Sequence, residues 1–340
     1  MQAAVMGLGS WGTAFALVLA DAGHDVRVWG RNAETVSSVN SSRRNARFHP
    51  DLDLPTTIHA TTDAAAALDS ADLVVLAVPA QSLRENLTAW GDAVPDDAIT
   101  LSLMKGLERG SGARMSQVVH AAAGCPPERI AVLSGPNPAR EVVRRQPTAS
   151  VIACADEDAA AQVQAWSLTP YFRPYTNADV VGVELGGVVK NVIALATGMA
   201  EGMGFGDNSK AAIMTRGLAE MTRLGVAMNA DPLTFMGLAG VGDLIATCSS
   251  PLSRNRTFGE NLGRGMTMDE VAAITAQTAE GVTSCAAVLE LAQQHGVDMP
   301  ITEHVSGVVS QGWAPRDMVA SLMSRVAKPE WHQDAPTDVG

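Results

Sequence analysis

One lysine stands alone in a long apolar stretch of the chain. Lys190 is the only charged residue between Glu184 and Glu201, and apolar side chains recur around it at helical spacing. A buried ammonium group needs a partner, a wet cleft or a shifted pKa. Two interpretations stay open here: a lysine that reaches the surface along its own aliphatic stem, and a lysine held in a cleft.

Two glycines precede this lysine on the same predicted helix. Gly186 and Gly187 cost helix stability, because glycine has the largest backbone entropy to lose on folding. Such a cost favours a position where another backbone or a ligand approaches closely. We therefore expect a helix that is covered on all sides, and this pair favours the cleft for Lys190.

A run of hydrogen-bond donors follows about sixty residues later. Ser253-Arg254-Asn255-Arg256 comes after Gly240–Cys248, and we treat residues 240–256 as a loop. An arginine fork, a hydroxyl, an amide and backbone N–H groups at a turn that opens a helix can surround a phosphate. A solvated loop whose serine caps a helix is the alternative. The run alone does not decide between them.

A glycine fingerprint stands near the start of the chain. Gly7-Leu8-Gly9-Ser10-Trp11-Gly12 lies between a predicted strand, Ala3–Met6, and a predicted helix, Thr13–Ala22, and Asp25–Trp29 is the next predicted strand. This order is the context that a dinucleotide-binding G-x-G-x-x-G requires. Arg31, and no acid, follows the second strand, which suits a ribose 2′-phosphate. An exposed arginine without a role is the alternative.

Strands alternate with helices as far as Tyr175. This alternation predicts a Rossmann-like, doubly wound, mostly parallel sheet. Ligands of such sheets bind beyond the carboxyl ends of the strands, where Lys105 and the Gly135-Pro136-Asn137 turn stand. The further predicted strands are Asp72–Val78, Ala98–Leu103, Ile130–Ser134, Thr148–Ala153 and Tyr171–Tyr175, and the helices between them are Thr62–Asp69, Gln81–Trp90 and Asp156–Ser167.

After Asn177 only helical patterns follow. We predict an α/β class protein with a dinucleotide-binding domain over residues 1–178, an all-α domain over 179–327, and a tail over 328–340 that lacks fixed structure. The predicted helices of the second domain are Val180–Ala200, Ser209–Met228, Asp231–Met236, Met268–Thr275, Thr283–His295 and Ile301–Ser310.

Composition excludes several classes of function. A chain of 340 residues with 46% hydrophobic and 18% charged residues is typical of a folded soluble protein of two domains. The net charge of −12 argues against nucleic acid or an anionic membrane as a partner, although a local basic pocket can still bind a small anion.

The four cysteines lie far apart, which indicates buried thiols in a reducing cytoplasm and neither a metal site nor a redox pair. Glycines break the apolar run of residues 3–20, so we expect no signal peptide and no membrane span.

These residues together resemble the bacterial type of NAD(P)-dependent glycerol-3-phosphate dehydrogenase, from about Val5 to about Ala327. The motifs that carry the resemblance lie in both predicted domains: Gly7-Leu8-Gly9-Ser10-Trp11-Gly12-Thr13-Ala14, Lys105-Gly106-Leu107-Glu108, Ser134-Gly135-Pro136, Gly186-Gly187-Val188-Val189-Lys190-Asn191-Val192, Gly240-Val241-Gly242-Asp243-Leu244, Ser253-Arg254-Asn255-Arg256 and Glu280-Gly281.

The resemblance implies the reduction of dihydroxyacetone phosphate to sn-glycerol 3-phosphate by NADPH or NADH, without a metal, as a step toward phospholipids. It makes Lys190, Lys105 and Asp243 the catalytic residues, with Lys190 as proton donor and acceptor. The implied substrate-binding residues are Lys105, Gly135, Asn137, Lys190, Asp243, Thr247, Ser253, Arg254 and Asn255. The implied cofactor-binding residues are Gly7, Gly9, Ser10, Trp11, Gly12, Arg31, Lys105, Ala139, Arg254 and Glu280. Asn137 departs from the family, which usually has Ser or Thr there.

The same resemblance implies a cytoplasmic homodimer with no nucleic-acid or membrane partner. Two alternatives remain. A ketopantoate or β-hydroxyacid reductase would share the fold and a helix lysine, and residues 253–256 would then bind a carboxylate. A dinucleotide sensor without turnover would keep only the fold. Lys105, Lys190 and Asp243 argue against the sensor.

Overall fold

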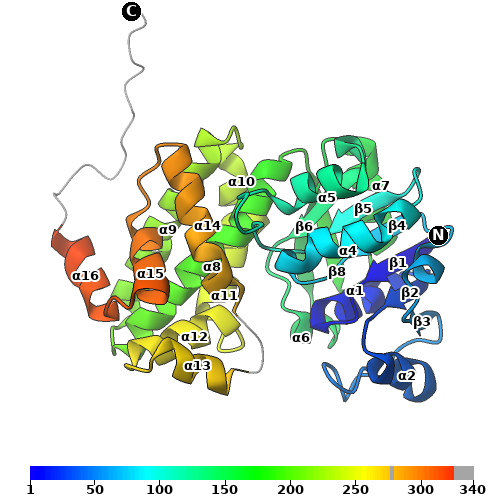
Figure 1. The fold of residues 1–340 in the computed structure, drawn as a ribbon, viewed down its shortest axis with the longest axis horizontal. Coiled ribbons are helices and arrows are strands. Elements are labelled where there is room, and N and C mark those ends of the chain that lie inside the picture. Colours follow the sequence, from blue (N-terminus) through cyan, green and yellow to red (C-terminus); the bar gives the residue numbers. More distant parts are fainter. Residues whose placement is uncertain (276–278, 325–340) are drawn as a thin grey trace, which may run out of the picture.

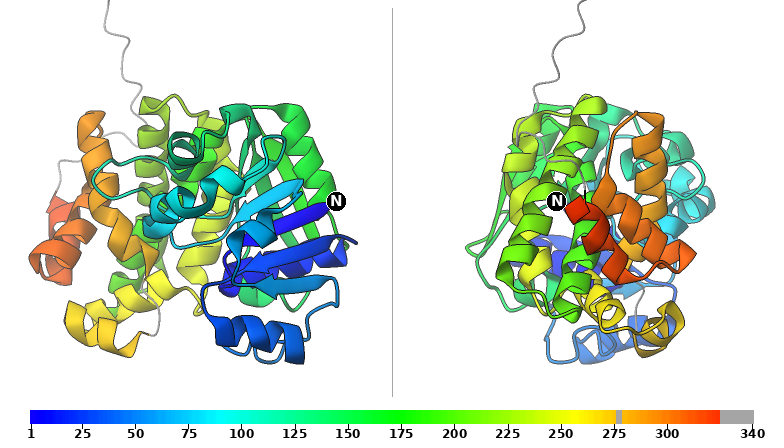
Figure 2. Two further views of the ribbon diagram at one scale, coloured as in Figure 1. Left: turned by 45° about the vertical axis from the view of Figure 1, so that its right-hand side comes forward. Right: turned by 90° about the vertical axis from the view of Figure 1, so that its left-hand side faces the viewer.

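The computed structural model describes residues 1–275 and 279–324. The N-terminal half of the chain forms an α/β part and the C-terminal half a helical part, and the two lie side by side in Figures 1 and 2. This arrangement confirms the predicted architecture. The predicted boundary between residues 178 and 179 falls between β8 and α8 and stays a prediction as a domain limit, and the predicted tail lies outside the described residues.

Eight strands form one sheet in the order β3-β2-β1-β4-β5-β6-β7-β8. All neighbouring strands pair in parallel except β6 and β7, which are antiparallel. Strand β4 is buried along its whole length, which explains its unbroken apolar run. The strands are β1 (Gln2–Met6), β2 (Asp25–Trp29), β3 (Ile58–Thr61), β4 (Leu73–Leu76), β5 (Ile99–Ser102), β6 (Ile130–Ser134), β7 (Thr148–Ala153) and β8 (Phe172–Asn177).

Helices cover the sheet. The helices of this part are α1 (Ser10–Asp21), α2 (Ala33–Ser42), α3 (Ala64–Leu68), α4 (Leu83–Trp90), α5 (Met115–Ala123), α6 (Ala139–Val142) and α7 (Glu157–Ser167). The sequence analysis predicts none of α2, β3 and α5. Helix α2 escapes the hydrophobic pattern because only Val39 of it is buried, although its N-cap, Asn32, is a readable signal.

Helix α8 forms the middle of the helical part, and its residues from Gly182 to Ala200 are buried. It is long and apolar enough to cross a membrane, but 89% of its apolar window is buried inside the molecule, as in the core helix of a globular domain. The helices are α8 (Val180–Gly202), α9 (Asp207–Ala227), α10 (Pro232–Met236), α11 (Asp243–Ser249), α12 (Arg254–Gly263), α13 (Met268–Ile274), α14 (Glu280–Gln294), α15 (Pro300–Gln311) and α16 (Pro315–Ser324).

Glycines let α8 and α12 touch backbone to backbone. A Cβ on Gly198 would lie 2.0 Å from the carbonyl oxygen of Arg256, and one on Gly259 would lie 2.1 Å from that of Leu195. No real Cβ fits at such distances, because the clash would push the two backbones apart. The glycines therefore set the separation of the two helices.

The treatment of residues 240–256 as a loop is wrong. A π-helical turn, Leu238–Gly242, leads directly into α11, and α12 begins at Arg254. Gly240, Gly242 and the Ser-Ser-Pro run give this segment a loop-like composition. Burial of Leu244 and Cys248 in the helical core overrides that local preference.

Candidate active site

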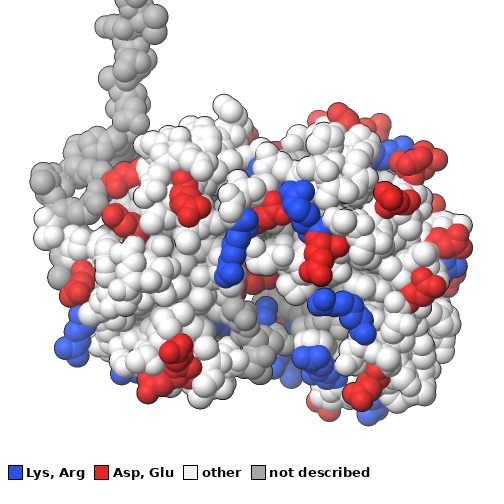
Figure 3. Space-filling view, viewed as in Figure 1, with Lys and Arg blue, Asp and Glu red and all other residues white. Residues whose placement is uncertain are grey.

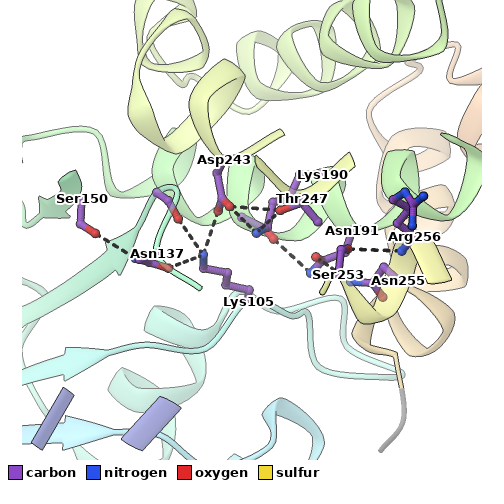
Figure 4. Close-up of polar contacts among 12 residues, drawn as sticks. Lys105, Asn137, Ser150, Lys190, Asn191, Asp243, Thr247, Ser253, Asn255 and Arg256 are labelled. Atoms are coloured by element: carbon purple, nitrogen blue, oxygen red, sulfur yellow. Dashed lines mark hydrogen bonds and ion pairs between the residues drawn. The ribbon is translucent and has the colours of Figure 1, made fainter. Parts of the chain in front are cut away.

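Two lysines meet at one carboxylate (Figure 4). The Lys190 Nζ, on α8, donates to Asp243 Oδ1 at 2.5 Å and to the Thr247 hydroxyl at 2.9 Å. The Lys105 Nζ, from the segment after β5, donates to Asp243 Oδ2 at 2.8 Å. The α/β part and the helical part thus each supply one ammonium group, and α11 supplies the carboxylate between them.

Burial tunes these charges. Lys190 is 6% exposed and Asp243 only 2% exposed. Burial lowers the pKa of Lys190 to about 8; the Asp243 carboxylate opposes this shift and the Lys105 ammonium adds to it. Burial alone would raise the pKa of Asp243, but the two ammonium groups hold it below its ordinary value. Lys190 is therefore not a surface lysine but a buried one with partners and a lowered pKa, which can release and regain a proton near neutral pH.

The glycines before Lys190 make room for these contacts. A Cβ on Gly186 would lie 2.5 Å from the carbonyl oxygen of Ala239, and one on Gly187 would lie 3.0 Å from the Ser134 hydroxyl. The expected close neighbour is therefore another backbone at Gly186, and side chains of the α/β part at Gly187.

Lys105 is held by the turn after β6 as well. Its Nζ donates to the Gly135 carbonyl oxygen at 3.3 Å and to Asn137 Oδ1 at 3.2 Å. The Asn137 amide in turn donates to the Ser150 hydroxyl on β7 at 3.0 Å. The asparagine thus accepts from the lysine and donates to the sheet at once, which a serine or threonine hydroxyl at this position would do from a single atom.

A buried chain of amides extends the site to α12 and α14. The Asn255 Nδ2 donates to Asn191 Oδ1 at 2.9 Å, and the Gly281 N–H donates to Asn255 Oδ1 at 2.9 Å. Asn191 is a residue that the sequence analysis quotes only within a motif. Its signal was present: like Lys190, it is a polar residue on a helix that is otherwise apolar.

The donor run at residues 253–256 divides into different roles. Ser253 caps α12, its Oγ accepting from the Arg256 N–H at 3.3 Å, and Arg254 is the first residue of that helix. The Arg256 guanidinium forms ion pairs with Glu201 at 2.7 Å and Glu260 at 3.3 Å. Ser253 caps a helix as the alternative expects, but the solvated loop of that alternative is wrong. Phosphate binding at this N-terminus, which favours anions, stays a prediction.

The β1–α1 turn has the geometry of a dinucleotide loop. A Cβ on Gly12 would lie 1.9 Å from the Gly7 carbonyl oxygen, so the turn closes only with glycine there. Gly9 caps α1 without a side chain, and a Cβ on it would meet no atom of the described residues within 4 Å. The Trp11 Nε1 is buried and has no hydrogen-bond partner among those residues. An open helix N-terminus of this kind fits a pyrophosphate.

The other predicted cofactor residues stand at the starts of helices or between elements. Ala139 begins α6, and Arg31 is exposed between β2 and α2. Glu280 begins α14; burial raises its pKa, and the positive charges of Arg254, Lys105 and Lys190 work against that rise. Glu280 therefore shares with Asp243 the charges of the two lysines, and its place in the site stays a prediction.

The sequence analysis expects no metal. Within residues 1–275 and 279–324, no group of three or more His, Cys, Asp and Glu side chains is placed to hold a metal ion. The four cysteines, Cys125, Cys154, Cys248 and Cys285, are all free thiols.

The comparisons with known proteins place the chain in a family. Models described as the NAD-dependent glycerol-3-phosphate dehydrogenase N-terminus and C-terminus match residues 2–160 and 179–320. A relative from Streptomyces avermitilis, named glycerol-3-phosphate dehydrogenase [NAD(P)+], is 61% identical over 97% of this chain and 98% of its own.

The solved structures agree. Glycerol-3-phosphate dehydrogenase from Coxiella burnetii superimposes with a TM-score of 0.90 at 36% identity, over 95% of this chain and 99% of its own. A ketopantoate reductase from Ralstonia eutropha reaches a TM-score of 0.60 at 16% identity, over 94% of this chain and 100% of its own, and so shares the fold alone. The chain therefore belongs to the NAD-dependent glycerol-3-phosphate dehydrogenase family.

Proposed function

We propose that the protein reduces dihydroxyacetone phosphate to sn-glycerol 3-phosphate with NADPH or NADH, and catalyses the reverse oxidation. The observation that carries this proposal is the buried Lys105–Asp243–Lys190 cluster at the junction of the two parts (Figure 4). A ketone reduction needs a hydride, a proton and a site that stabilises negative charge on the substrate oxygen.

The two lysines have different tasks. When bound, the reduced nicotinamide supplies the hydride to the ketone carbon. Lys190 donates the proton to the substrate oxygen on which charge develops, because burial brings its pKa to about 8. Lys105 holds the substrate beside the cofactor, and its positive charge stabilises the same oxygen. Asp243 and Thr247 fix the direction of the Lys190 ammonium.

The phosphate of the substrate belongs at the start of α12. Ser253, Arg254 and Asn255 stand at or next to that N-terminus, where the helix dipole and the guanidinium both favour a dianion. Figure 3 shows Lys and Arg side chains, with Asp and Glu side chains among them, around the hollow between the two parts, so local positive charge is present there although the net charge is −12. We assign Gly135 and Asn137 to the substrate side of the cleft, next to Lys105.

The cofactor belongs along the β1–α1 turn. Gly7, Gly9, Ser10, Trp11 and Gly12 form the pyrophosphate cradle, and Arg31 stands where a 2′-phosphate would lie. Ala139, Lys105, Arg254 and Glu280 complete the cofactor side.

One assay tests the function. The purified protein should consume NADPH with dihydroxyacetone phosphate and should be nearly inactive with ketopantoate, β-hydroxyacids or unphosphorylated dihydroxyacetone. Turnover of a carboxylate substrate at a comparable kcat/KM would favour the hydroxyacid alternative. NADPH binding without turnover of any of these compounds would favour the sensor.

We also propose a cytoplasmic homodimer that works without a metal, a nucleic acid or a membrane. The support is the family resemblance together with four free thiols, which suit a reducing compartment. Light scattering on the eluted peak of a size-exclusion column measures the mass directly; a monomeric mass at micromolar concentration would remove the dimer from the proposal.

A further inference from the structure

The loop that carries Lys105 folds back on itself. Leu107 and Arg114 form an isolated antiparallel bridge, and the Glu108 N–H donates to the Ala113 carbonyl oxygen at 2.9 Å. The loop is therefore a closed unit, and whatever holds Arg114 also holds the stretch that begins at Lys105.

Leu107 joins this loop to the helical part. It is fully buried, and it packs in the apolar core of the helical part and not in that of the sheet. The Gln81 side chain donates to the Leu107 carbonyl oxygen at 2.8 Å from the sheet side. Leu107, at the base of the loop, is thus embedded in the helical core, while the chain before and after the loop belongs to the α/β part.

Glu184 of α8 binds the C-terminal end of the loop, at Arg114 and Ser116. Its Oε2 accepts from Arg114 Nη1 at 2.5 Å and from the Ser116 hydroxyl at 2.6 Å, while its Oε1 accepts from the Ser116 N–H at 2.8 Å. The side chains of Arg114 and Glu184 are only 13% and 5% exposed. Breaking such a pair leaves a buried charge without a partner, so the two parts resist separation here.

A second ion pair on the same loop differs from the Arg114–Glu184 pair in its exposure and in the parts that it joins. Arg84 and Glu108 pair at 2.7 Å, but their side chains are 46% and 17% exposed and both belong to the α/β part. The arginine of this pair is half-exposed, and the pair does not cross between the parts. It is worth little to stability and is a matched control.

Helix α8 connects the Glu184 contact to the catalytic lysine. Gly187, one turn after Glu184, lies against the Lys105 side chain, since a Cβ on it would stand 3.3 Å from Lys105 Cγ. Lys190 follows after almost another turn, about 9 Å from Glu184 along the helix axis. Both lysines are therefore positioned by the same stretch of α8.

We propose that Glu184 is a positioning residue: by clasping Arg114 and Ser116 it ties the Lys105 loop to α8, and so fixes the Lys105 ammonium relative to Lys190 and Asp243. The proposal rests on the proposed function of these lysines. It predicts that the spacing of the two ammonium groups does not depend on the cofactor, because the tie lies outside the cofactor cradle.

The test compares Glu184→Gln, Ser116→Ala and Arg84→Met in the full-length protein, each checked for folding by its melting curve. We expect Glu184→Gln to lower kcat/KM for dihydroxyacetone phosphate by about 10²-fold, since misplacement of a catalytic group by about 1 Å has that effect. Ser116→Ala should lower it less and Arg84→Met not at all. The Kd of NADPH should change far less than kcat/KM, because Lys105 is one of several groups that we assign to the cofactor side.

A second measurement separates positioning from stability. Lys190 titrates beside Asp243, Lys105 and Glu280, and the Lys105 ammonium lowers its pKa. In protein with ¹³C-labelled lysine Cε, assigned through Lys190→Met, NMR should show the Lys190 titration move to higher pH in Glu184→Gln, because Lys105 is no longer held nearby. This readout needs no turnover, so it tests the tie even if the parent fails to reduce dihydroxyacetone phosphate.

Two results would overturn the proposal. One is a folded Glu184→Gln protein with the kcat/KM and the Lys190 titration of the parent. The other is a variant that loses NADPH binding and turnover in equal measure, which would make Glu184 a general support of the fold.

Discussion

In the helical part, Lys190, Asp243 and Asn255 are held by partners within the protein, whereas no side chain caps the N-terminus of α1 at the β1–α1 turn. The ammonium of Lys190 is bonded to Asp243 and Thr247, but the Trp11 Nε1 has no partner among the described residues. The residues that we propose for catalysis are thus held by contacts within the protein, and the N-terminus of α1 offers uncapped N–H groups to the cofactor that we propose there.

The difference follows from what each region has to do. A group that acts on a developing charge has to be fixed in advance, since reorganisation during the reaction would raise the barrier. A loop that wraps a pyrophosphate needs exposed N–H groups instead. Substitutions in the helical part should therefore change turnover or stability, and substitutions around the turn should change cofactor binding.

Removing the proton donor should produce the largest effect. Lys190→Met keeps the length of the side chain and removes the ammonium, so kcat should fall by roughly 10² to 10⁴. The Kd of NADPH, measured by quenching of protein fluorescence, should stay near the parent value. Near-normal turnover would refute the role of this lysine, and a parallel loss of NADPH binding would erase the contrast between the two regions.

Removing Arg254, which we propose to bind the substrate phosphate, should produce the second-largest effect. Arg254→Ala leaves a bound dianion short of a charged partner, which should cost about 2–5 kcal/mol in kcat/KM for dihydroxyacetone phosphate. Unphosphorylated dihydroxyacetone is the control, because its weak turnover should hardly change. If both substrates lose equally, Arg254 supports the fold and not the phosphate.

The protonation state of Lys190 gives a prediction without any mutation. The pKa of Lys190 is lowered to about 8, so the ammonium is present below that pH and is lost above it. The kcat/KM for reduction should fall by about tenfold per pH unit above pH 8. The oxidation of glycerol 3-phosphate needs the neutral amine, and its kcat/KM should instead rise up to the same pH and then level off. If the pH profiles of both directions instead changed slope near the ordinary lysine pKa of 10.5, this would contradict the assignment of the proton transfer to Lys190.

The close contact of α8 and α12 should matter for stability. Gly198→Ala drives a Cβ into the carbonyl oxygen of Arg256, and overpacking of this kind costs about 1–3 kcal/mol. Gly206→Ala is the control, because a Cβ there would meet no described atom within 4 Å. Thermal unfolding followed by circular dichroism compares the two. Equal melting temperatures would mean that the helices can separate without loss.

Much of this arrangement follows from local patterns in the sequence. The strand-turn-helix order around Gly7–Gly12 predicts the sheet. The isolation of Lys190 on an apolar helix leaves a surface lysine and a cleft lysine open, and Gly186 and Gly187 favour the cleft. Lys190 and Asp243 are 53 positions apart in the sequence, and Lys105 and Asp243 are 138 positions apart. Hydrophobic periodicity therefore cannot predict either contact. These contacts depend on how the two parts pack, and the resemblance supplied them.

The errors have a common physical origin. Helix α11 was assigned to a loop because the glycines before it and the serines and proline after it dominate its composition, while its helical state depends on burial of Leu244 and Cys248. Helix α2 and strand β3 were not predicted because short or exposed elements bury too few side chains to leave a pattern. The tie through Glu184 left no signal for the same reason as the lysine pairs, since its partner lies 70 positions away.

The smallest expected effect lies at the open edge of the cofactor cradle. Arg31→Asp should weaken NADPH binding and leave NADH binding almost unchanged, since only NADPH carries the 2′-phosphate. Arg31 is exposed, so water and salt screen its charge, and we expect a loss of roughly fivefold. Its neighbours add little, because Arg44 is paired with Asp53 and Arg43 donates to the Leu54 carbonyl oxygen.

Salt dependence sharpens this comparison. The preference of the parent for NADPH over NADH should shrink as ionic strength rises, whereas the effect of Lys190→Met, whose partners are buried, should not. The alternative is an Arg31 that stacks on the adenine and does not contact the 2′-phosphate. In that case Arg31→Asp weakens both cofactors equally and salt does not alter their ratio. A parent enzyme that clearly prefers NADH would show that an arginine at this position does not select the 2′-phosphate. The contrast between the Lys105–Asp243–Lys190 cluster and the cofactor-binding region would then rest on the β1–α1 turn alone.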